Sequence, residues 1–317
     1  MQEVTIVIPN YNGKRLLENC LKTLEQQTYK DFKVLVVDNG SSDGSTEVSS
    51  EKLELEIVSL KENLGFCRAV NLGIQKTKTP YLILLNNDTE TDRYFVEKLL
   101  AGIKKSERIF SCGAQMIDFK DHEMLDNAGD LYTAMGWAVA RGKGKKCEDF
   151  ERAVRVFSCC AGAAIYRKKV FEKIGYFDEE HFAYLEDVDL GYRARIDGFE
   201  NWYTPEAKVY HVGSATTGTR YNEKKVFLAA RNTIFVIYKN MPLLQLIINF
   251  PFIFAGMIVK TLFFVKKGFV KDYWSGICEG VRDCHKCRKV SFTGKNLPHY
   301  LKIQLELWGN IGRILGA

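Results

Sequence analysis

The sequence predicts an α/β fold, in which a mostly parallel sheet is flanked by helices and followed by a helical, apolar and basic C-terminal extension. Three observations lead to this prediction. Short β-branched runs lack polar alternation, amphipathic stretches of about 10 to 15 residues separate them, and a polar segment follows each run. We place the boundary near residue 225, with one unit at 1–225 and the extension at 226–317.

Four strands and three helices are expected in the first hundred residues. The apolar runs that predict strands are VTIVIP (4–9), FKVLVVD (32–38), LEIVSL (55–60) and YLILL (81–85). Between them, apolar residues recur at helical spacing, at 16–24, 66–74 and 95–103. This alternation of the two periods is typical of parallel sheets that helices cover on both faces.

The middle of the chain gives weaker signals. CGAQMIDF (112–119) is consistent with a strand, and the stretch around GKGKKCEDFER (142–152) reads as a charged loop. An apolar strand, a short helix and a turn are expected over 157–179. Val188, Tyr192 and Ile196 then mark one face of a helix, with Gly198 as its stop.

The C-terminal region differs in composition from the rest of the chain. Residues from Phe227 onward hold thirteen Lys and Arg against four Asp and Glu, whereas the whole chain has 45 against 39. Twenty uncharged residues lie between Lys239 and Lys260, about the length that crosses a bilayer core. Three arrangements fit this stretch: a spanning helix, a helix lying in the membrane surface, and a buried helical hairpin.

This asymmetry of charge predicts a partner with an anionic surface. We expect the inner leaflet of a membrane and not nucleic acid, because the region lacks a regular aromatic and basic pattern. Apolar contacts between chains, in a homo-oligomer, are the alternative. Nine cysteines, several within apolar runs, and an N-terminus without a signal-peptide pattern lead us to expect reduced thiols and a cytoplasmic protein on the cytoplasmic face of the membrane.

Polar segments follow all four predicted strands, at the edge where parallel sheets bind ligands. Asp38 ends the second strand in VVDNGSSDG and can accept hydrogen bonds from a base or a ribose; an Asx-turn is the structural alternative. The loop lacks G-x-G-x-x-G, which disfavours a nicotinamide cofactor. Asn86 and Asp88, two residues apart after the fourth strand, can hold Mg²⁺ or Mn²⁺ against a diphosphate, or simply cap the strand.

Two further segments carry candidate catalytic groups. Glu186, Asp187 and Asp189 crowd the entrance of a predicted helix, where one acid can serve as a general base or as an ordinary N-cap. His211 follows the run AKVY and can bind a metal or a phosphate. The stretch CEGVRDCHKC (278–287) resembles half a zinc site, but its spacing is irregular.

Seven segments, in order, resemble a family 2 glycosyltransferase of the rhamnosyltransferase type, with the Rossmann-like GT-A fold. They are VTIVIPNYNG, KVLVVDNGSSDGS, ENLGFCRAVNLGI, YLILLNNDTE, GAAIYRKKVFEKIGYFDE, YLEDVDLGYRAR and VYHVGSAT, and they cover roughly residues 3 to 220. One departure is that Asn86 stands where the family's metal motif usually has its first acid, which weakens the expected affinity for metal.

The resemblance implies a role for each matching position. Asp187 would be the catalytic base, and Asp88 and His211 would hold Mg²⁺ or Mn²⁺ on the donor diphosphate. The nucleotide-sugar would be bound by the following residues: Pro9, Tyr11, Asn12, Asp38, Asn39, Asn63, Gly65, Asn71, Asn86, Asn87 and Glu186.

The implied activity is a metal-assisted, inverting transfer of a sugar from a nucleotide-diphosphate donor, for which dTDP-rhamnose is our expectation. The acceptor would be a hydroxyl of a glycan or lipid-linked glycan in cell-surface polysaccharide synthesis. A non-catalytic nucleotide-sugar-binding module is the first alternative. A sugar nucleotidyltransferase is the second, although PNYNG lacks the Gly-rich, basic loop that a triphosphate needs.

Overall fold

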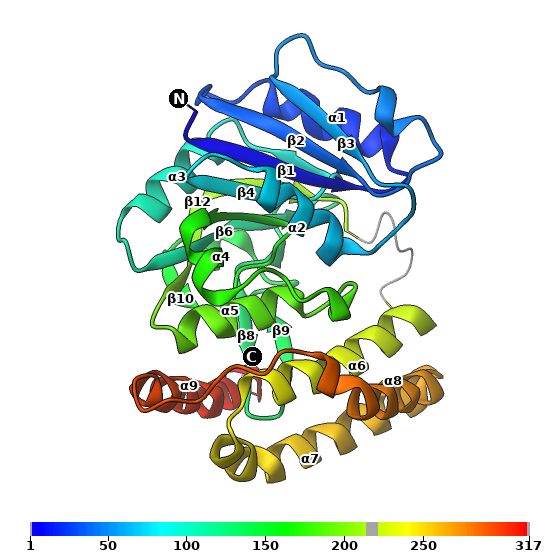
Figure 1. Cartoon of the computed structure of the whole chain (residues 1–317), viewed down its shortest axis with the longest axis vertical. Helices are drawn as coiled ribbons and strands as arrows, with labels where there is room; N and C mark the ends of the chain where they lie inside the picture. The colour runs from blue at the N-terminus through cyan, green and yellow to red at the C-terminus, as the bar shows by residue number, and fades with distance from the viewer. Residues whose placement is uncertain (1, 214–220, 316–317) are drawn as a thin grey trace.

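One large sheet with helices on both faces forms the upper part of the molecule, and a group of helices forms its lower end (Figure 1). The computed structural model describes residues 2–213 and 221–315. The sheet has ten strands, eight of them in the order β10-β12-β6-β11-β4-β1-β2-β3, and a separate hairpin contains β8 and β9.

The four predicted strands of the first half form one parallel block. They are β1 (Val4–Asn10), β2 (Phe32–Asp38), β3 (Leu55–Ser59) and β4 (Tyr81–Leu85). β1 lies between β2 and β4, so its residues are covered by sheet on both edges and by helices on both faces. In this register Asn10 lies opposite Asp38, which brings the ends of β1 and β2 together.

Helices cover the two faces of the sheet, as their apolar stripes predict. One face carries α1 (Lys14–Leu24) and α3 (Phe95–Lys104). The other carries α2 (Phe66–Lys76), α4 (Lys168–Ile174) and α5 (Glu186–Ile196). All the helices and strands that periodicity predicted in the first hundred residues are therefore confirmed.

The second half of the sheet comes from the region where the sequence signal was weak. Its strands are β5 (Thr89–Thr91), β6 (Ile109–Asp118), β7 (Leu125–Asn127), β10 (Val154–Val156), β11 (Ala163–Arg167) and β12 (Glu200–His211). The hairpin has β8 (Asp130–Tyr132) and β9 (Ala138–Ala140). β6 and β11 confirm the strands expected at 112–119 and within 157–179. β12 was not predicted, and neither were the strands of three residues, which show too little periodicity to be recognised in sequence.

Four helices form the lower end: α6 (Glu223–Asn240), α7 (Leu243–Lys267), α8 (Val270–Asp283) and α9 (Leu297–Leu315). α7 lies along the edge of the molecule farthest from β1, β2 and β3 (Figure 1). The expectation of a helical C-terminal extension is confirmed. A buried hairpin is excluded for α7, because only 17% of its most apolar window is buried.

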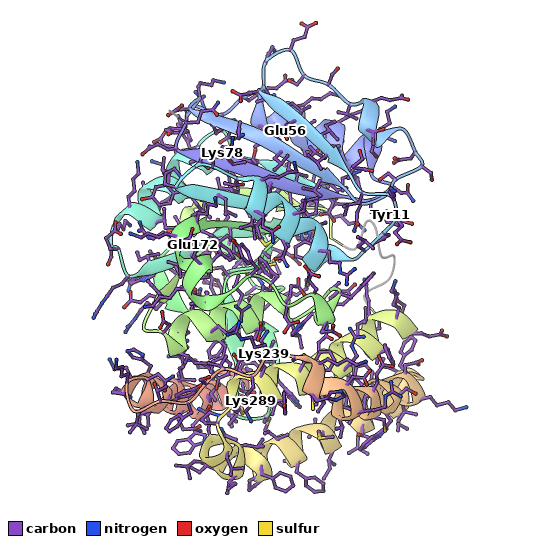
Figure 2. All side chains as sticks on the ribbon, in the orientation of Figure 1. Tyr11, Glu56, Lys78, Glu172, Lys239 and Lys289 are labelled. Atoms are coloured by element: carbon purple, nitrogen blue, oxygen red, sulfur yellow. The ribbon has the colours of Figure 1, made fainter. Side chains whose placement is uncertain are left out.

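The lower helices are joined to the upper part through buried polar contacts. Lys239 of α6 lies between the two parts (Figure 2), and its Nζ is 2.9 Å from Asp189 Oδ2 and 2.6 Å from Asp178 Oδ2. Asp189 also pairs with Arg193 at 2.9 Å. Burial alone would raise the pKa of Asp189, but the two cations hold it well below its usual range. The charged form of this carboxylate therefore binds α6 to α5.

Candidate active site

The polar segments that follow β1, β2 and β4 meet at one edge of the sheet. Asn10 links them, because its Nδ2 donates to Asp38 Oδ1 at 3.0 Å and its Oδ1 accepts from Asn87 Nδ2 at 2.7 Å. All three side chains are buried. Gly13 permits this arrangement, since a Cβ there would lie 2.3 Å from Asn87 Nδ2. Sequence reasoning missed Asn10 because a lone Asn at a strand end carries no signal of its partners.

The predicted nucleotide-binding residues near β1 lie in the loop that follows it. Tyr11 extends past the carboxyl end of β1 (Figure 2), and the half-buried Pro9 precedes it. Asn12 has a left-handed φ of 47°, and its Oδ1 accepts from Ser42 N at 2.9 Å. Asp38 accepts from Ser41 N at 3.0 Å, so it shapes the same loop, and its predicted contact with the base stays a prediction.

A second loop is built around Asn39. Its Nδ2 donates to Asn63 Oδ1 at 3.0 Å and to the Gly65 carbonyl at 3.1 Å. Gly65 has φ of +89°, and a Cβ there would lie 2.6 Å from the ring of Phe182. Asn39, Asn63 and Gly65 thus lie together at this edge, and Phe182, just before α5, packs on them.

Asn71 lies apart from this loop, inside α2. Its amide makes paired hydrogen bonds with the backbone of Phe177, at 2.8 Å to the carbonyl oxygen and 3.0 Å from the N–H. The side chain is buried and both of its ends are occupied. Asn71 therefore braces the segment before α5, and its predicted contact with the nucleotide-sugar stays a prediction.

Asp88 and His211 come together because β5 pairs with β12, which sets His211 opposite Thr89. His211 Nε2 lies 3.4 Å from Asp88 Oδ1, and its Nδ1 lies 2.8 Å from Asp126 Oδ2. Burial lowers the pKa of His211, but hydrogen bonds to Asp126 and Asp88 outweigh burial and raise the pKa to about 9. Asp126 was not predicted, because its segment, β7, gave no strand signal.

Asp88 and His211, which we call the metal corner, fit one divalent cation whose other ligands would come from a diphosphate. Two neighbouring ligands at about 2.1 Å from a metal lie about 3 Å apart, close to the observed separation of Nε2 and Oδ1. Asp126 would orient the imidazole through Nδ1–H, the usual outer partner of a metal-binding histidine. Among residues 2–213 and 221–315, no three His, Cys, Asp or Glu side chains form a complete metal site, and this includes the stretch 278–287.

Asp187 occupies the second position of α5, as predicted. Its carboxylate accepts hydrogen bonds from the N–H groups of Val188, at 2.8 Å, and Ala161. Burial raises the pKa of Asp187 to about 6, more than these bonds lower it. Burial and the charge of Asp187 also raise the pKa of Glu186 and of Asp130. Glu186 Oε2 is buried and has no hydrogen-bond partner in the described part of the chain.

Two adjacent residues of one loop, Ala161 and Gly162, contact the predicted base and the strand end beside Asp88. Gly162 O accepts from Asn86 N at 2.8 Å, while the preceding residue, Ala161, binds the Asp187 carboxylate. A second connection runs through β7, because Asn127 Nδ2 donates to Asp130 Oδ1 at 2.9 Å. Residues distant in sequence, from 86 to 88 and at 187, therefore lie in one acidic region.

The backbone before α5 is unusual. Phe182, Tyr184 and Leu185 have φ of 61°, 74° and 64°, values that cost about 1–3 kcal/mol for each residue without a glycine. Asn232 of α6, fully buried, holds this turn: its Nδ2 lies 3.0, 2.8 and 2.7 Å from the carbonyl oxygens of residues 181, 183 and 184. The C-terminal region thus positions the segment that carries Asp187. The predicted division at residue 225 stays a prediction, and the two parts pack closely.

Three of the cavities in the described part of the chain have volumes of about 590–630 Å³, and they are lined by residues other than Asp38, Asp88 and Asp187. We therefore define the candidate site by the hydrogen bonds of its residues. In the motif VYHVGSAT, the residues after Gly213 lie outside the described residues.

Similarity to known proteins shows the family to which this chain belongs. The sequence model described as Glycosyl transferase family 2 matches residues 5–175, more than half of the chain. The chain belongs to glycosyltransferase family 2. It is 26% identical, over 72% of its length and 84% of the relative, to the N-acetylglucosaminyl-diphospho-decaprenol L-rhamnosyltransferase of Mycobacterium tuberculosis. It is 27% identical to the O-antigen chain rhamnosyltransferase RfbN of Salmonella typhimurium, over 72% of this chain and 73% of the relative.

Solved structures confirm the GT-A fold of this family 2 enzyme. The mannosyltransferase PcManGT from Pyrobaculum calidifontis, in complex with GDP-Man and Mn²⁺, has a TM-score of 0.56 at 13% identity and covers 89% of this chain and 87% of its own. TarS 1-349 of S. aureus with UDP-GlcNAc has a TM-score of 0.54 at 13% identity, covering 92% and 94%. All nine cysteines are unpaired in this structure, and their expected reduced state in a cytoplasmic protein stays a prediction.

Proposed function

We propose that this family 2 glycosyltransferase is an inverting enzyme that transfers a sugar from a nucleotide-diphosphate donor to a hydroxyl of a lipid-linked glycan. We favour dTDP-rhamnose as the donor, because the two relatives reported above are named rhamnosyltransferases. The observation that carries the proposal is the loop at Ala161 and Gly162, which holds the base candidate Asp187 next to the strand end at 86–88.

The nucleotide side of the site is pre-formed. Asn10, Asp38 and Asn87 fix one another, so the loops that would hold the base and ribose are ordered before the donor binds. Asp88 and His211 would hold Mg²⁺ or Mn²⁺, which when bound offsets the charge of the leaving diphosphate. The imidazole is kept in place for this role by Asp126.

Asp187 accepts the proton. With a pKa of about 6 it is ionised at neutral pH, yet basic enough to take a proton from an acceptor hydroxyl as attack proceeds. The acceptor oxygen forms a bond to the anomeric carbon while the bond from that carbon to the phosphate oxygen breaks. The nucleoside diphosphate leaves with the electron pair, and this single displacement inverts the anomeric configuration.

We assign Glu186 a role other than that of the base. Its pKa is raised, and its buried Oε2 has no hydrogen-bond partner in the described part of the chain. A protonated carboxyl there can donate a hydrogen bond to a sugar hydroxyl. In this proposal Glu186 binds the sugar, the role that the sequence predicts for it, and Asp187 is the base.

A donor screen tests the proposal. Thermal unfolding is measured with dTDP-, UDP- and GDP-sugars, each with and without Mn²⁺, and slow release of nucleoside diphosphate is followed for the sugar that stabilises the protein most. We expect stabilisation by one class of donor, increased by Mn²⁺, and slow donor hydrolysis. Stabilisation without any hydrolysis or transfer would favour the non-catalytic module, and release of pyrophosphate from a nucleoside triphosphate would favour the nucleotidyltransferase.

A further inference from the structure

The helix α7 has its polar side chains facing the protein and its apolar side chains facing outward. Its buried residues, Gln245, Asn249, Ile253 and Gly256, form one stripe that packs on the molecule. Gln245 Oε1 accepts from the Tyr192 hydroxyl at 2.8 Å, and Asn249 exchanges two hydrogen bonds with Gln304. A helix that faced water would have the opposite pattern. The outward face of α7 is therefore built for apolar surroundings.

The exposed residues of this face are large. At least 38% of each side chain is exposed at the following positions: Leu243, Leu244, Ile247, Ile248, Phe250, Phe252, Phe254, Ile258, Val259, Leu262, Phe263 and Val265. Soluble proteins rarely expose such a contiguous apolar surface without a partner. By length and composition α7 is the one helix of the described chain that could cross a membrane.

α9 extends this surface. Leu297, Leu301, Leu305 and Trp308 are exposed along one side of that helix, at spacings of four, four and three residues. A groove of about 590 Å³ joins the two helices, and Leu243, Leu301 and other residues of both line it. We call the exposed apolar residues of α7 and these four residues of α9 the apolar face.

Basic residues border the apolar face. α7 contains no acidic residue and ends in Lys266 and Lys267, and Lys271 follows in α8. All three lysines are exposed. Leu305 of α9 also borders a polar cavity of about 630 Å³ whose charged lining residues are Arg108, Arg155, Arg195, Lys302 and Arg313 together with Glu200 and Glu306, which pair with Arg155 and Arg195. Cations beside an apolar surface are complementary to the anionic headgroups above the acyl chains of a bilayer.

We propose that the apolar face inserts into the surface of an anionic membrane, with α7 lying in the plane of the bilayer. The buried stripe from Gln245 to Gly256 keeps the first half of the helix on the protein, which a spanning orientation would not allow. Lipid is favoured over a second copy of the chain, because a two-fold interface would bring two basic borders together without neutralising them. The inner leaflet, which is anionic, is the source of lipid to which we commit.

The surface lies close to the candidate site. The hairpin of β8 and β9 connects them: the charge of Asp187 raises the pKa of the buried Asp130 at its base, and a Cβ on Gly256 of α7 would lie 2.9 Å from Met135 at its tip. Met135 comes five positions after Asp130, so this part of the hairpin spans at most ~17 Å. It ends at the protein-facing side of α7, and the apolar face lies beyond the ~10 Å width of that helix. This distance suits an acceptor whose lipid is in the membrane and whose sugar reaches Asp187, an extension that rests on the proposed function.

Flotation of the full chain with vesicles tests the membrane contact. We expect the protein to float with vesicles of phosphatidylcholine and phosphatidylglycerol, and to float less with phosphatidylcholine alone. Phe250 and Phe254, whose rings stack 6.3 Å apart on the apolar face, are replaced together by Gln. Each replacement should weaken partitioning by about tenfold. The matched control, with both residues replaced by Leu, should float nearly as well as the unmodified protein.

A second double variant tests the contribution of the basic residues beside the apolar face. Replacing Lys266 and Lys267 by Gln should lower binding to the anionic vesicles by about fivefold for each lysine and leave binding to phosphatidylcholine unchanged. A high-pH wash that leaves the protein in the membrane would overturn the in-plane orientation. Failure to float, or a dimer in light scattering that the Gln pair at 250 and 254 dissociates, would overturn membrane docking.

The two proposals can fail separately. Donor hydrolysis in solution depends on the candidate site and not on the apolar face, so the Gln pair should retain it. A protein that floats but neither hydrolyses nor transfers would contradict the proposed function only. A protein that hydrolyses the donor but does not float would contradict the membrane contact only.

Discussion

Asn232 gives a test of how the C-terminal region supports catalysis. Its amide is within hydrogen-bond distance of three carbonyl oxygens in the turn before α5, and it has two hydrogens to share among them. At about 1 kcal/mol for each hydrogen bond, Asn232→Leu should lower the free energy of unfolding by about 2 kcal/mol, and by somewhat more because buried carbonyls lose their partner. Urea denaturation measures this change.

Asn232→Leu should lower kcat by more than the loss of folded protein explains. Three residues of the turn have left-handed φ, so we expect the turn to relax when Asn232 is replaced and to shift Asp187. A displacement of about 1 Å at a reacting group lowers kcat by as much as 10²-fold. KM for the donor should rise less than kcat falls, because Asn10, Asp38 and Asn87 keep their mutual hydrogen bonds, although Phe182 of this turn packs on Gly65.

The matched control is Asn249→Leu, which removes another buried amide of the C-terminal region, one that pairs with Gln304 and Trp308. We expect a similar loss of stability with little change in kcat. Equal kcat values for the two variants, measured well below their unfolding transitions, would refute the positioning role of Asn232.

Three further predictions concern buried charges. Since Asp187 must be ionised to accept a proton and its pKa is about 6, kcat/KM should fall about tenfold per pH unit below pH 6; a flat profile from pH 7 to 5 would contradict its role. Lys239→Met leaves Asp189 with one cation fewer in a buried site and should cost about 3–5 kcal/mol of stability, measured by urea denaturation; a loss below 1 kcal/mol would count against the network. Asp126→Asn should weaken Mn²⁺-dependent donor binding about 10- to 100-fold in calorimetry, because His211 loses the carboxylate that orients it, and unchanged affinity would argue against that role.

The spacing of apolar residues in the sequence was sufficient to predict the strands and helices of the first hundred residues. β1, β2 and β4 are continuous apolar runs, and the helices between them show a clear apolar stripe, so both periods were visible in sequence. The polar residues after each strand then had to share one edge of the sheet, which is why Asp38 and Asp88 could be predicted there.

The residues that complete the site could not be predicted, because their roles depend on contacts between distant segments. Asp126 reaches His211, 85 residues away, through a strand of three residues, and Asn232 supports a turn about 50 residues before it. The orientation of α7 could not be predicted from the local sequence pattern either. Its composition indicates membrane affinity, but only the structure shows that Gln245 and Asn249 face the protein.

The variant Asp187→Asn tests most directly whether Asp187 is the base of a glycosyl transfer. Asp187→Asn keeps the size of the side chain but removes the proton acceptor. Once a donor is identified, single-turnover transfer by this variant should be about 10²- to 10⁴-fold slower, while calorimetry should show nearly unchanged donor affinity. An Asn variant that transfers sugar at the original rate would contradict the account.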